Sequence, residues 1–229
     1  MTRPNILTAL RRRLNVPSRR HGQERSADWY DRVFSRSRVY QTSYHDSPYY
    51  VLWALIVDRI RRDKLRRVLD IGCGTGQLAA FLFEHGIEEY VGIDFSSAAI
   101  AQASKAAPRG RFLVDDARRS DVYASVAHDV LVCTEVLEHI EDDFAVVSKF
   151  RPGVRCLLSV PSYPSEGHVR HFADEGAVTE RYSPYFDGLD VMALPVPQSE
   201  ANRFFLADGY RNEAQFGEAP PLVPAAPAV

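Results

Sequence analysis

The stretch 67–77 constrains the fold of this 229-residue chain more than any other. Val68, Leu69 and Ile71 form a short apolar run, which is typical of a strand buried on both faces of a parallel sheet. Three glycines follow at alternate positions, and residues 78–86 then show helical spacing that ends at a glycine. Strand, glycine turn and helix in this order let the backbone approach a nucleotide-like ligand closely.

The spacing of the three glycines narrows the type of ligand. A dinucleotide-binding fingerprint, G-x-G-x-x-G, needs its third glycine at position 77, which is Gln77. Here the third glycine is Gly76, one residue early, and the acidic residue Asp70 ends the strand. An adenosyl ligand without pyrophosphate does not need a helix N-terminus aimed at phosphate. The turn therefore favours such a ligand over a dinucleotide.

The sequence VLDIGCGTG at 68–76 resembles the first motif of the class I S-adenosylmethionine (SAM) dependent methyltransferases. The resemblance continues, in the family's order and spacing, at Gly92–Ser96, Val114–Ala117 and Asp129–His139, and spans roughly 68–160. It implies an α/β fold: a Rossmann-like, seven-stranded, mostly parallel sheet flanked by helices, with an N-terminal helical cap. It also implies SAM as the cofactor and methyl transfer as the activity.

Acidic residues at strand ends are the strongest candidates for holding the cofactor. Asp94 lies 18 residues after Gly76, near the spacing at which a carboxylate meets ribose hydroxyls, although it could instead cap the next helix. By the resemblance, Asp116 meets the adenine amino group and Ala117 lies beside the ring, although Asp115 and Asp116 could equally cap a helix. The SAM site expected from the resemblance comprises Asp70, Gly72, Cys73, Gly74, Gly76, Gln77, Asp94, Phe95, Ser96, Asp115, Asp116, Ala117, Thr134 and Glu135, with Tyr44 and Tyr50 from the cap.

Composition and patterning divide the chain into four parts. The last part contains four prolines after residue 219, which cannot build a core. We predict a flexible arginine-rich lead (1–28), an aromatic-rich N-terminal helical cap (29–62), the SAM-dependent methyltransferase domain (63–216) and a disordered tail (217–229). Within the domain, Leu189–Val196 and Phe204–Tyr210 are predicted to form a final strand pair, preceded by a helix within 175–183.

Methyl transfer to a hydroxyl or amine requires a base that removes a proton. Candidates follow two predicted strands: Glu135 and His139 after the fourth, and His168 and His171 after the fifth. Prolines and glycines keep the later segment irregular, so it lies over the carboxyl edge of the sheet. We predict that His168 or His171 is the base, with Glu135 and His139 forming the pocket floor. The alternative is that both later histidines face solvent.

A second reading of the same residues involves a metal ion. Glu135, Glu138 and His139 form Glu-x-x-Glu-His, which resembles the first part of the metal site of Hen1-type RNA 3′-end 2′-O-methyltransferases and also occurs in ubiquinone-pathway O-methyltransferases. A further histidine could come from His168 or His171. The Hen1 pattern after the fifth strand is only partly matched, so we predict no metal and activity that survives chelation. If a metal is present, the expected ligands are Glu135, Glu138, His139 and His171.

Net charge and composition bear on the acceptor. The formal charge is −2, without the basic excess that phosphate neutralisation would need. We therefore predict a small-molecule acceptor, such as a natural product, sugar or quinone-like compound, methylated on oxygen or nitrogen in a biosynthetic reaction. Two alternatives stay open: a Hen1-like RNA methyltransferase with a divalent metal, favoured by the arginines before residue 40, and a non-catalytic SAM-binding partner subunit. The oligomeric state does not follow from the sequence.

The cysteines and apolar runs indicate the compartment. Cys73, Cys133 and Cys156 have neither metal-ligand nor redox-pair spacing, which predicts reduced, buried thiols in a cytoplasmic protein. No apolar run approaches the ~20 residues that a membrane span needs. The arginine-rich start lacks the apolar core of a secretory signal. We therefore expect no membrane contact and a cytoplasmic location.

Overall fold

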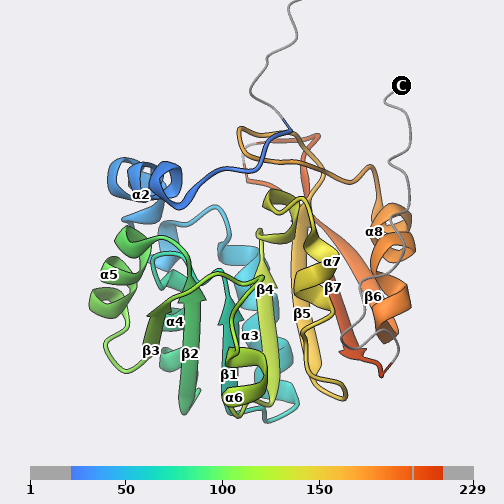
Figure 1. The fold of residues 1–229 in the computed structure, drawn as a ribbon, viewed down its shortest axis with the longest axis horizontal. Coiled ribbons are helices and arrows are strands. Elements are labelled where there is room, and N and C mark those ends of the chain that lie inside the picture. Colours follow the sequence, from blue (N-terminus) through green and yellow to red (C-terminus); the bar gives the residue numbers. More distant parts are fainter. Residues whose placement is uncertain (1–21, 198, 214–229) are drawn as a thin grey trace, which may run out of the picture.

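The computed structural model describes residues 22–197 and 199–213, so most of the predicted lead and all of the predicted tail lie outside the described residues. Its centre is a seven-stranded sheet in the order β3-β2-β1-β4-β5-β7-β6 (Figure 1). The strands are β1 (Arg67–Ile71), β2 (Glu89–Asp94), β3 (Arg111–Val114), β4 (Val130–Thr134), β5 (Arg155–Pro161), β6 (Phe186–Pro195) and β7 (Arg203–Arg211). The first five are parallel, and β7 is antiparallel to both its neighbours. The predicted Rossmann-like, mostly parallel sheet is confirmed.

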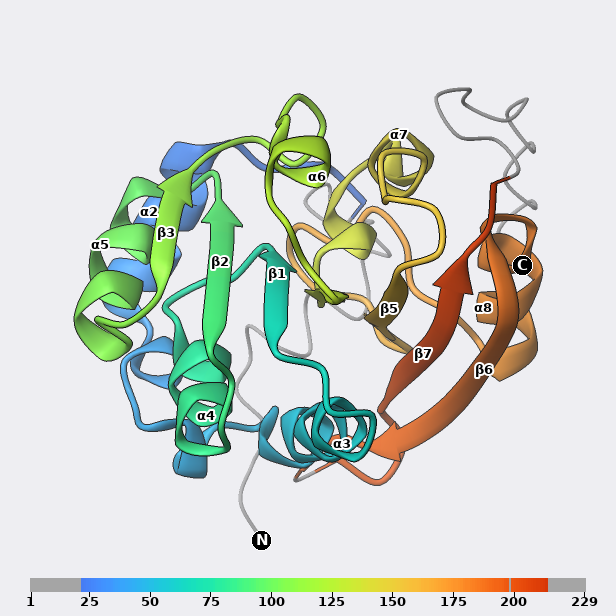
Figure 2. The same ribbon diagram turned by 90° about the horizontal axis from the view of Figure 1, so that it is seen from below.

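Helices cover both faces of the sheet. Figure 2 shows α3 and α4 on one face and α6 and α7 on the other. The α-helices are α2 (Ala27–Arg36), α3 (Tyr50–Arg62), α4 (Gln77–Glu84), α5 (Ser97–Ala106), α6 (Val122–Ser125), α7 (Asp143–Val147) and α8 (Glu175–Tyr182). Single turns of 3₁₀-helix are η1 (Arg38–Tyr40), η2 (Tyr44–Asp46), η3 (Leu137–His139) and η4 (Ser183–Tyr185).

Strand β1 shows why the sheet needs helices on both faces. Val68 packs into the core that α3 and α4 share with the sheet, whereas Leu69 and Ile71 pack into the core on the face of α6, α7 and α8. Side chains alternate between the faces of a strand, so a central parallel strand is apolar on both. The continuous apolar run in the sequence reflects this double burial.

The strand pair predicted at the C-terminal end of the domain is present. Strand β6 begins at Phe186 rather than Leu189, because an irregularity in the pairing with β7 between Asp187 and Asp190 lets the chain pair again before it. Helix α8 occupies the position predicted for the preceding helix and packs against β6 and β7. The hairpin closes one edge of the sheet.

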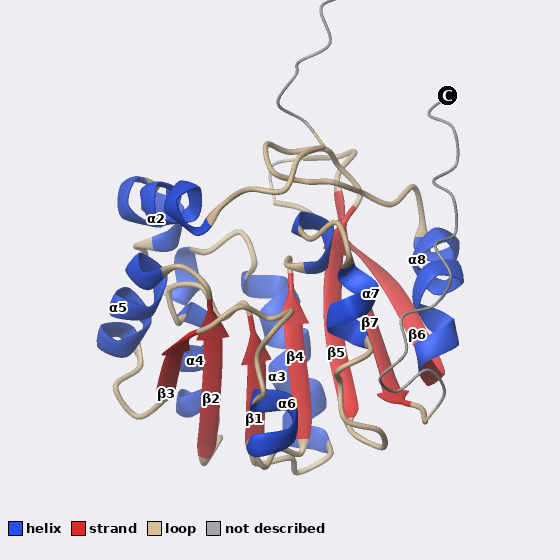
Figure 3. Ribbon diagram, viewed as in Figure 1, coloured by secondary structure: helices blue, strands red, loops and turns tan. Residues whose placement is uncertain are grey.

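Helix α2 and the long loops gather at the carboxyl ends of the parallel strands (Figure 3). Asp31 of α2 accepts hydrogen bonds from the Ser96 hydroxyl, at 2.5 Å, and from the Ala98 amide, at 3.0 Å. These bonds lower the pKa of Asp31 and attach α2 to the first turn of α5, where the helix dipole favours a carboxylate. Helix α2 is therefore positioned at the sheet edge where the sequence motifs converge, whereas α3 of the predicted cap covers a face of the sheet.

Among the described residues, no helix is both long enough and apolar enough to cross a membrane.

Candidate active site

A cavity of about 530 Å³ opens at the carboxyl ends of the parallel strands. Ligands of open α/β sheets bind at this edge. The predicted site residues in its wall are Asp70, Gly72, Cys73, Gly74, Gln77, Asp94, Phe95, Asp115, Asp116, Ala117, Thr134, Glu135, Glu138, His139 and His168. We call the part formed by residues 70–77, 93–95 and 115–118 the glycine-turn end. The part formed by residues 134–140 and 163–168 is the glutamate–histidine end.

The glycine turn forms a wall of bare backbone. Gly72 and Gly74 have φ angles of 75° and 53°, in the left-handed region that favours glycine. A Cβ on Gly72 would lie 2.3 Å from Cγ2 of Val136, so no side chain fits there. The amides of Gly72 and Cys73 both donate to the Ile93 carbonyl, at 2.8 and 2.9 Å. The turn is therefore fixed against β2 with its backbone open to the cavity.

Asp94 is positioned by two backbone amides. Gly74 donates to its Oδ2 at 3.0 Å and Ser96 donates to its Oδ1 at 2.9 Å. Burial nevertheless raises the pKa of Asp94 to about 6, because these two bonds compensate only part of the lost hydration. Each carboxylate oxygen keeps acceptor capacity for a further donor. The alternative role as the helix cap falls to Ser96, whose side chain caps α5, and Asp94 accepts from the amide of that capping residue.

Asp70 is a second buried carboxylate beside the turn. Its Oδ2 accepts from the Tyr90 hydroxyl at 2.5 Å, and its Oδ1 has no hydrogen-bond partner among the described residues. Burial raises the pKa of Asp70 to about 7, and Asp94 adds to the effect through like-charge repulsion. A ligand that brings positive charge and hydroxyl donors would be complementary to this pair.

Asp116 stands at the end of β3 in a different environment. The Arg118 guanidinium forms a bidentate contact with the Asp116 carboxylate. Its Nε donates to Oδ1 at 3.0 Å and its Nη2 donates to Oδ2 at 2.8 Å. This contact holds the pKa of Asp116 below its usual value. Arg118 also pairs with Glu24 at 2.6 Å, which joins β3 to the N-terminal segment. The Asp116 carboxylate is thus ionised and fixed in the cavity wall.

Two residues expected in the cofactor site lie just outside the cavity wall. A Cβ on Gly76 would lie 2.8 Å from Cα of Ala103, so this glycine allows α4 and α5 to pack closely. Ser96 is fully buried, caps α5 by accepting from the Ala99 amide and donates to Asp31. The structure gives both residues supporting roles in the shape of the site.

Tyr44 and Tyr50 also lie away from the cavity. The Tyr44 hydroxyl donates to Oε2 of Glu84 at 2.6 Å, and its ring stacks on Phe81 with centroids 4.4 Å apart. Tyr50 is 38% exposed and stacks on the same Phe81 ring. These tyrosines attach the N-terminal cap to α4.

Other aromatic residues of the N-terminal segment do line the cavity, and the sequence reasoning did not select them: Trp29, Tyr30, Tyr40 and Tyr49, together with Tyr163 after β5. Tyr30 lies between the rings of Phe95, at 5.2 Å, and His139, at 5.6 Å. Burial raises the pKa of Tyr30, so its hydroxyl stays protonated. The aromatic density of residues 29–50 was the available signal, but it did not distinguish which rings face inward.

Glu135 projects from the end of β4 with a strained backbone. Its φ is 54°, an uncommon value for a residue other than glycine. Its amide donates to both the carbonyl and the hydroxyl oxygen of Ser159, and that hydroxyl donates to Oε1 of Glu135 at 2.8 Å. Burial raises the pKa of Glu135 to about 8. The carboxyl is therefore held in place, and in its ionised form it is a stronger base than an ordinary glutamate.

Glu138 is more deeply buried. Its side chain is 0% exposed, and neither carboxyl oxygen has a hydrogen-bond partner among the described residues. Burial, with Glu135 nearby, raises the pKa of Glu138 well above its usual value. Unpartnered buried carboxyls are costly and need a specific explanation.

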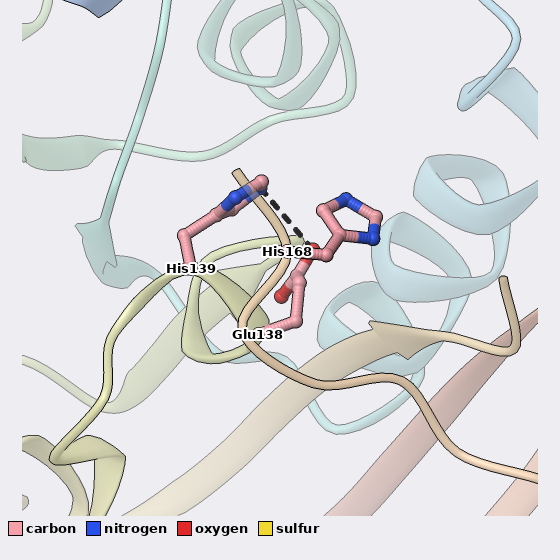
Figure 4. Close-up of side chains that lie close together, drawn as sticks. All are labelled: Glu138, His139 and His168. Carbon is pink, nitrogen blue, oxygen red and sulfur yellow. Dashed lines mark ion pairs between the residues drawn. The ribbon is translucent and has the colours of Figure 1, made fainter. Parts of the chain in front are cut away.

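His139 and His168 lie beside Glu138, and Figure 4 shows the three side chains together. Nδ1 of His139 bonds the Gly167 carbonyl at 3.0 Å, and Nδ1 of His168 bonds the Tyr163 carbonyl at 2.9 Å. A carbonyl can only accept, so each Nδ1 carries the proton and each Nε2 is the basic nitrogen. Burial lowers the pKa of His139 to about 4, which keeps the ring neutral.

His171 is not part of this group. Its side chain is exposed and does not line the cavity. The loop after β5 folds back onto η3 through the Val169 amide, which donates to the Glu138 carbonyl at 2.8 Å. This turn directs His168 inward and leaves His171 outside. Of the two later histidines that the sequence singled out, the structure brings only His168 to the site.

The N-terminal segment before α2 runs over the carboxyl ends of the strands (Figure 1), and its Glu24 and Arg25 line the cavity. The Gly22 amide donates to the His168 carbonyl at 3.0 Å, and Arg25 pairs with Glu166 at 3.4 Å. Glu24 pairs with Arg118 and accepts from the Glu141 amide at 3.0 Å. These contacts join the two ends of the cavity above its opening.

Comparison with family models identifies a methyltransferase domain over residues 68–153. Comparison with curated proteins found no match. Many solved structures share the fold. One is the 1,6-didemethyltoxoflavin-N1-methyltransferase of Burkholderia thailandensis, solved with its acceptor and S-adenosylhomocysteine (SAH). It is 18% identical, with a TM-score of 0.64, covering 82% of this chain and 87% of that chain.

Two further solved structures share the fold at similarly low sequence identity. The N-methyltransferase NodS of Bradyrhizobium japonicum, solved with SAH, is 17% identical with a TM-score of 0.61, covering 82% of this chain and 98% of that chain. The methyltransferase domain of the bacterial CtHen1-C is 17% identical with a TM-score of 0.51, covering 70% and 96%. At these identities the likeness concerns the fold, which is the one that the sequence motifs predicted.

Proposed function

We propose that this chain is a class I SAM-dependent methyltransferase that transfers the methyl group of SAM to an oxygen or nitrogen of a small molecule. The observation that carries the proposal is the joining of two chemistries in one cavity. The glycine-turn end offers carboxylates to a cationic, hydroxyl-bearing ligand, and the glutamate–histidine end offers groups that can bind and deprotonate an acceptor.

SAM is proposed to occupy the glycine-turn end. Asp94 would accept from the two ribose hydroxyls, because both of its oxygens are already oriented by backbone amides. Asp70 lies beside the turn and is complementary to the positive charge of the methionine portion. Asp116 and Ala117 would flank the adenine, with Arg118 fixing the Asp116 carboxylate. This arrangement leaves the sulfonium facing the glutamate–histidine end.

Glu135 is proposed to accept the proton of the acceptor. Its carboxyl is fixed by Ser159, and its raised pKa suits proton transfer near neutral pH. As the O–H or N–H proton moves to Glu135, the freed electron pair of the acceptor bonds to the methyl carbon. The carbon–sulfur bond breaks with its electrons passing to sulfur, which gives neutral SAH. Alignment of the three reacting atoms can supply roughly 7–11 kcal/mol of the rate enhancement.

The role predicted for His168 as the base stays a prediction. We place Glu135 ahead of it because the His168 ring lies beside Glu138 and His139, with one ligand atom of each residue within 4.8 Å of the others. His171 is not proposed as a base, since its side chain lies outside the cavity.

The covered cavity supports a small acceptor. The segment containing Gly22, Glu24 and Arg25 crosses its opening, and a macromolecule would have to displace these contacts. The volume of about 530 Å³ falls within the range of small-molecule sites, and aromatic side chains form much of the wall. The 1,6-didemethyltoxoflavin-N1-methyltransferase and the N-methyltransferase NodS share the fold, which is consistent with this class of acceptor.

The test combines binding with product analysis. Calorimetry should detect SAH binding to the purified full chain with one site per chain. Incubation with SAM and a panel of phenols, sugars, quinone precursors and amines should then add one methyl group to an acceptor, with equimolar SAH, by mass spectrometry. Absence of SAH binding would refute the cofactor assignment, and SAH binding without methylation of any panel member would refute the acceptor class.

An RNA 3′-end 2′-O-methyltransferase is the second candidate. The observation that favours it is the cluster of Glu138, His139 and His168, with Glu135 nearby, on a fold shared with the CtHen1-C domain. The net charge of −2 and the covered cavity favour the small molecule. Short RNAs with free and blocked 3′-terminal 2′-hydroxyls, added to the same panel, distinguish the two because only the free ends could be methylated.

A further inference from the structure

The Glu138 carboxyl is a buried acidic group that the proposed methyl transfer does not by itself explain. It is 0% exposed, has no hydrogen-bond donor among the described residues, and lies near a second glutamate that raises its pKa further. Arg170 offsets this effect only in part, because its guanidinium donates to the carbonyls of Leu137, Ile140 and Glu141 and not to the Glu138 carboxyl. Among the described residues, no arginine or lysine is in direct contact with the carboxyl to compensate a buried carboxylate.

Two imidazoles are prepared to share such a cation. The Nδ1–H groups of His139 and His168 are bound to the carbonyls of Gly167 and Tyr163. A backbone carbonyl on one ring nitrogen is the usual outer contact of a metal-bound histidine, because it fixes the tautomer and orients the other nitrogen. The His139 Nε2 lies 3.5 Å from Oε1 of Glu138.

The spacing fits one ion. One ligand atom from each of Glu138, His139 and His168 lies within 4.8 Å of the others. Ligands ~2.1 Å from a single ion are ~3–4 Å apart, so the group closes with a small side-chain adjustment. Figure 4 shows the three side chains extending from η3 and from the loop after β5. The Val169 amide, which donates to the Glu138 carbonyl, holds these two segments together.

From this geometry we infer a divalent transition-metal site formed by Glu138, His139 and His168. Two imidazoles and one carboxylate suit Zn²⁺, Co²⁺, Mn²⁺ or Fe²⁺ better than Mg²⁺, which prefers oxygen ligands. Glu135 stays outside the ligand set because Ser159 holds its carboxyl. His171 is also excluded, which differs from the ligand set expected from the sequence. The prediction of no metal rested on a missing later ligand, and His168 now supplies one.

The ion would supply positive charge next to the acceptor, which favours its deprotonated form. Glu138, His139 and His168 would hold the ion against the cavity wall, and Glu135 would remain available for the proton. This role rests on the proposed function, whereas metal binding itself does not.

Direct binding measurements test the inference. The full chain, without a polyhistidine tag, is stripped with a chelator and titrated with CoCl₂, following visible absorption, and with ZnCl₂ by calorimetry. We expect one ion per chain and at least tenfold weaker binding of MgCl₂. His168→Ala and the isosteric Glu138→Gln should each weaken Co²⁺ binding at least tenfold, whereas His171→Ala should bind as the wild type does.

SAH calorimetry on the same stripped protein separates this inference from the proposed function. Wild-type protein that binds SAH but takes up neither Co²⁺ nor Zn²⁺ would overturn the metal site and leave the cofactor assignment intact. Metal uptake without SAH binding would overturn the cofactor assignment and leave the metal site intact. Retained binding in both His168→Ala and Glu138→Gln, or loss in His171→Ala, would also overturn the ligand assignment. Since Glu138→Gln preserves the side-chain shape, its result stands even if His168→Ala fails to fold.

Discussion

The two ends of the cavity are built on different principles. At the glycine-turn end, the backbone forms the wall and Asp94 is oriented by two amides. At the glutamate–histidine end, side chains form the wall, Glu135 sits on a strained backbone and Glu138 has no hydrogen-bond partner among the described residues. The first end is organised before any ligand binds. The second end contains buried glutamates with raised pKa values, which is typical of the part of a site that performs the reaction.

The largest effect should come from the glutamate–histidine end. Glu135→Gln removes the proposed proton acceptor but keeps the side-chain shape, so turnover should fall ~10²–10⁴-fold with SAH affinity unchanged. Steady-state kinetics and calorimetry measure the two quantities. Glu141→Gln, at an exposed position nearby, is the matched control. Full turnover in Glu135→Gln would assign the proton to another group, with His168 as the next candidate.

The next largest effect should come from the glycine-turn end. Asp94→Ala removes the acceptor for both ribose hydroxyls, so SAH affinity should fall by at least ~1.5 kcal/mol, roughly tenfold, by calorimetry. Asp187→Ala, on the edge strand β6, provides the control. If Asp94→Ala bound SAH with wild-type affinity, Asp94 would not belong to the cofactor site, and the contrast between the two ends would disappear.

The pH dependence of SAH binding tests the same end without removing a side chain. Burial raises the pKa of Asp94 to about 6, and only the carboxylate can accept from both hydroxyls. SAH affinity should therefore weaken as pH falls from 6 to 5, by roughly fivefold. Asp94→Asn cannot titrate and should show no such weakening.

The same raised pKa has an opposite effect on the stability of the ligand-free protein. Its folded-state value lies above the unfolded value of 3.8, so the Asp94 contribution to stability is complete below pH ~4 and is lost as pH rises through 6. Asp94→Asn should flatten this part of the stability profile, measured by urea unfolding. A profile identical to that of the wild type would show that Asp94 titrates normally.

The smallest effect is expected at Tyr44, which the sequence placed in the site and the structure does not. Tyr44→Phe removes the hydrogen bond to Glu84, so unfolding free energy should fall by ~1 kcal/mol. SAH affinity should remain within about twofold of the wild type. Tenfold weaker SAH binding would return Tyr44 to the cofactor site and show that the N-terminal cap closes more tightly than the described geometry.

Sequence reasoning placed residues in the cavity wall where the pattern is local. Asp70, Gly72 and Gly74 belong to one contiguous turn, and Asp94 ends the neighbouring strand, so strand order alone brings them together. The sequence did not indicate which of His168 and His171 faces the cavity. The two lie three residues apart in an irregular loop, and only the contact of Val169 with Glu138 decides which one turns inward.

The aromatic residues of the N-terminal cap show the same limit. Tyr40 and Tyr49 line the cavity, whereas Tyr44 and Tyr50 stack on Phe81 of α4. Tyr40 lies in η1, Tyr44 lies in η2, and Tyr49 and Tyr50 stand at the start of α3, so no single helical or strand periodicity relates them. Their orientation depends on how the cap docks on α4, which is a tertiary contact without a sequence signature.

The contacts of Glu24 carry a kinetic consequence. This residue joins Arg118, the partner of Asp116, to the loop of Glu141 on the far side of the opening. With SAM at the glycine-turn end, as proposed, its nucleoside would lie beside this bridge and would be retained until these contacts open. We therefore expect an ordered sequence in which SAM binds first and SAH departs last, with the opening of the segment setting the pace of repeated turnover. The turnover rate would then depend on the Glu24–Arg118 ion pair, which does not contact the reacting atoms.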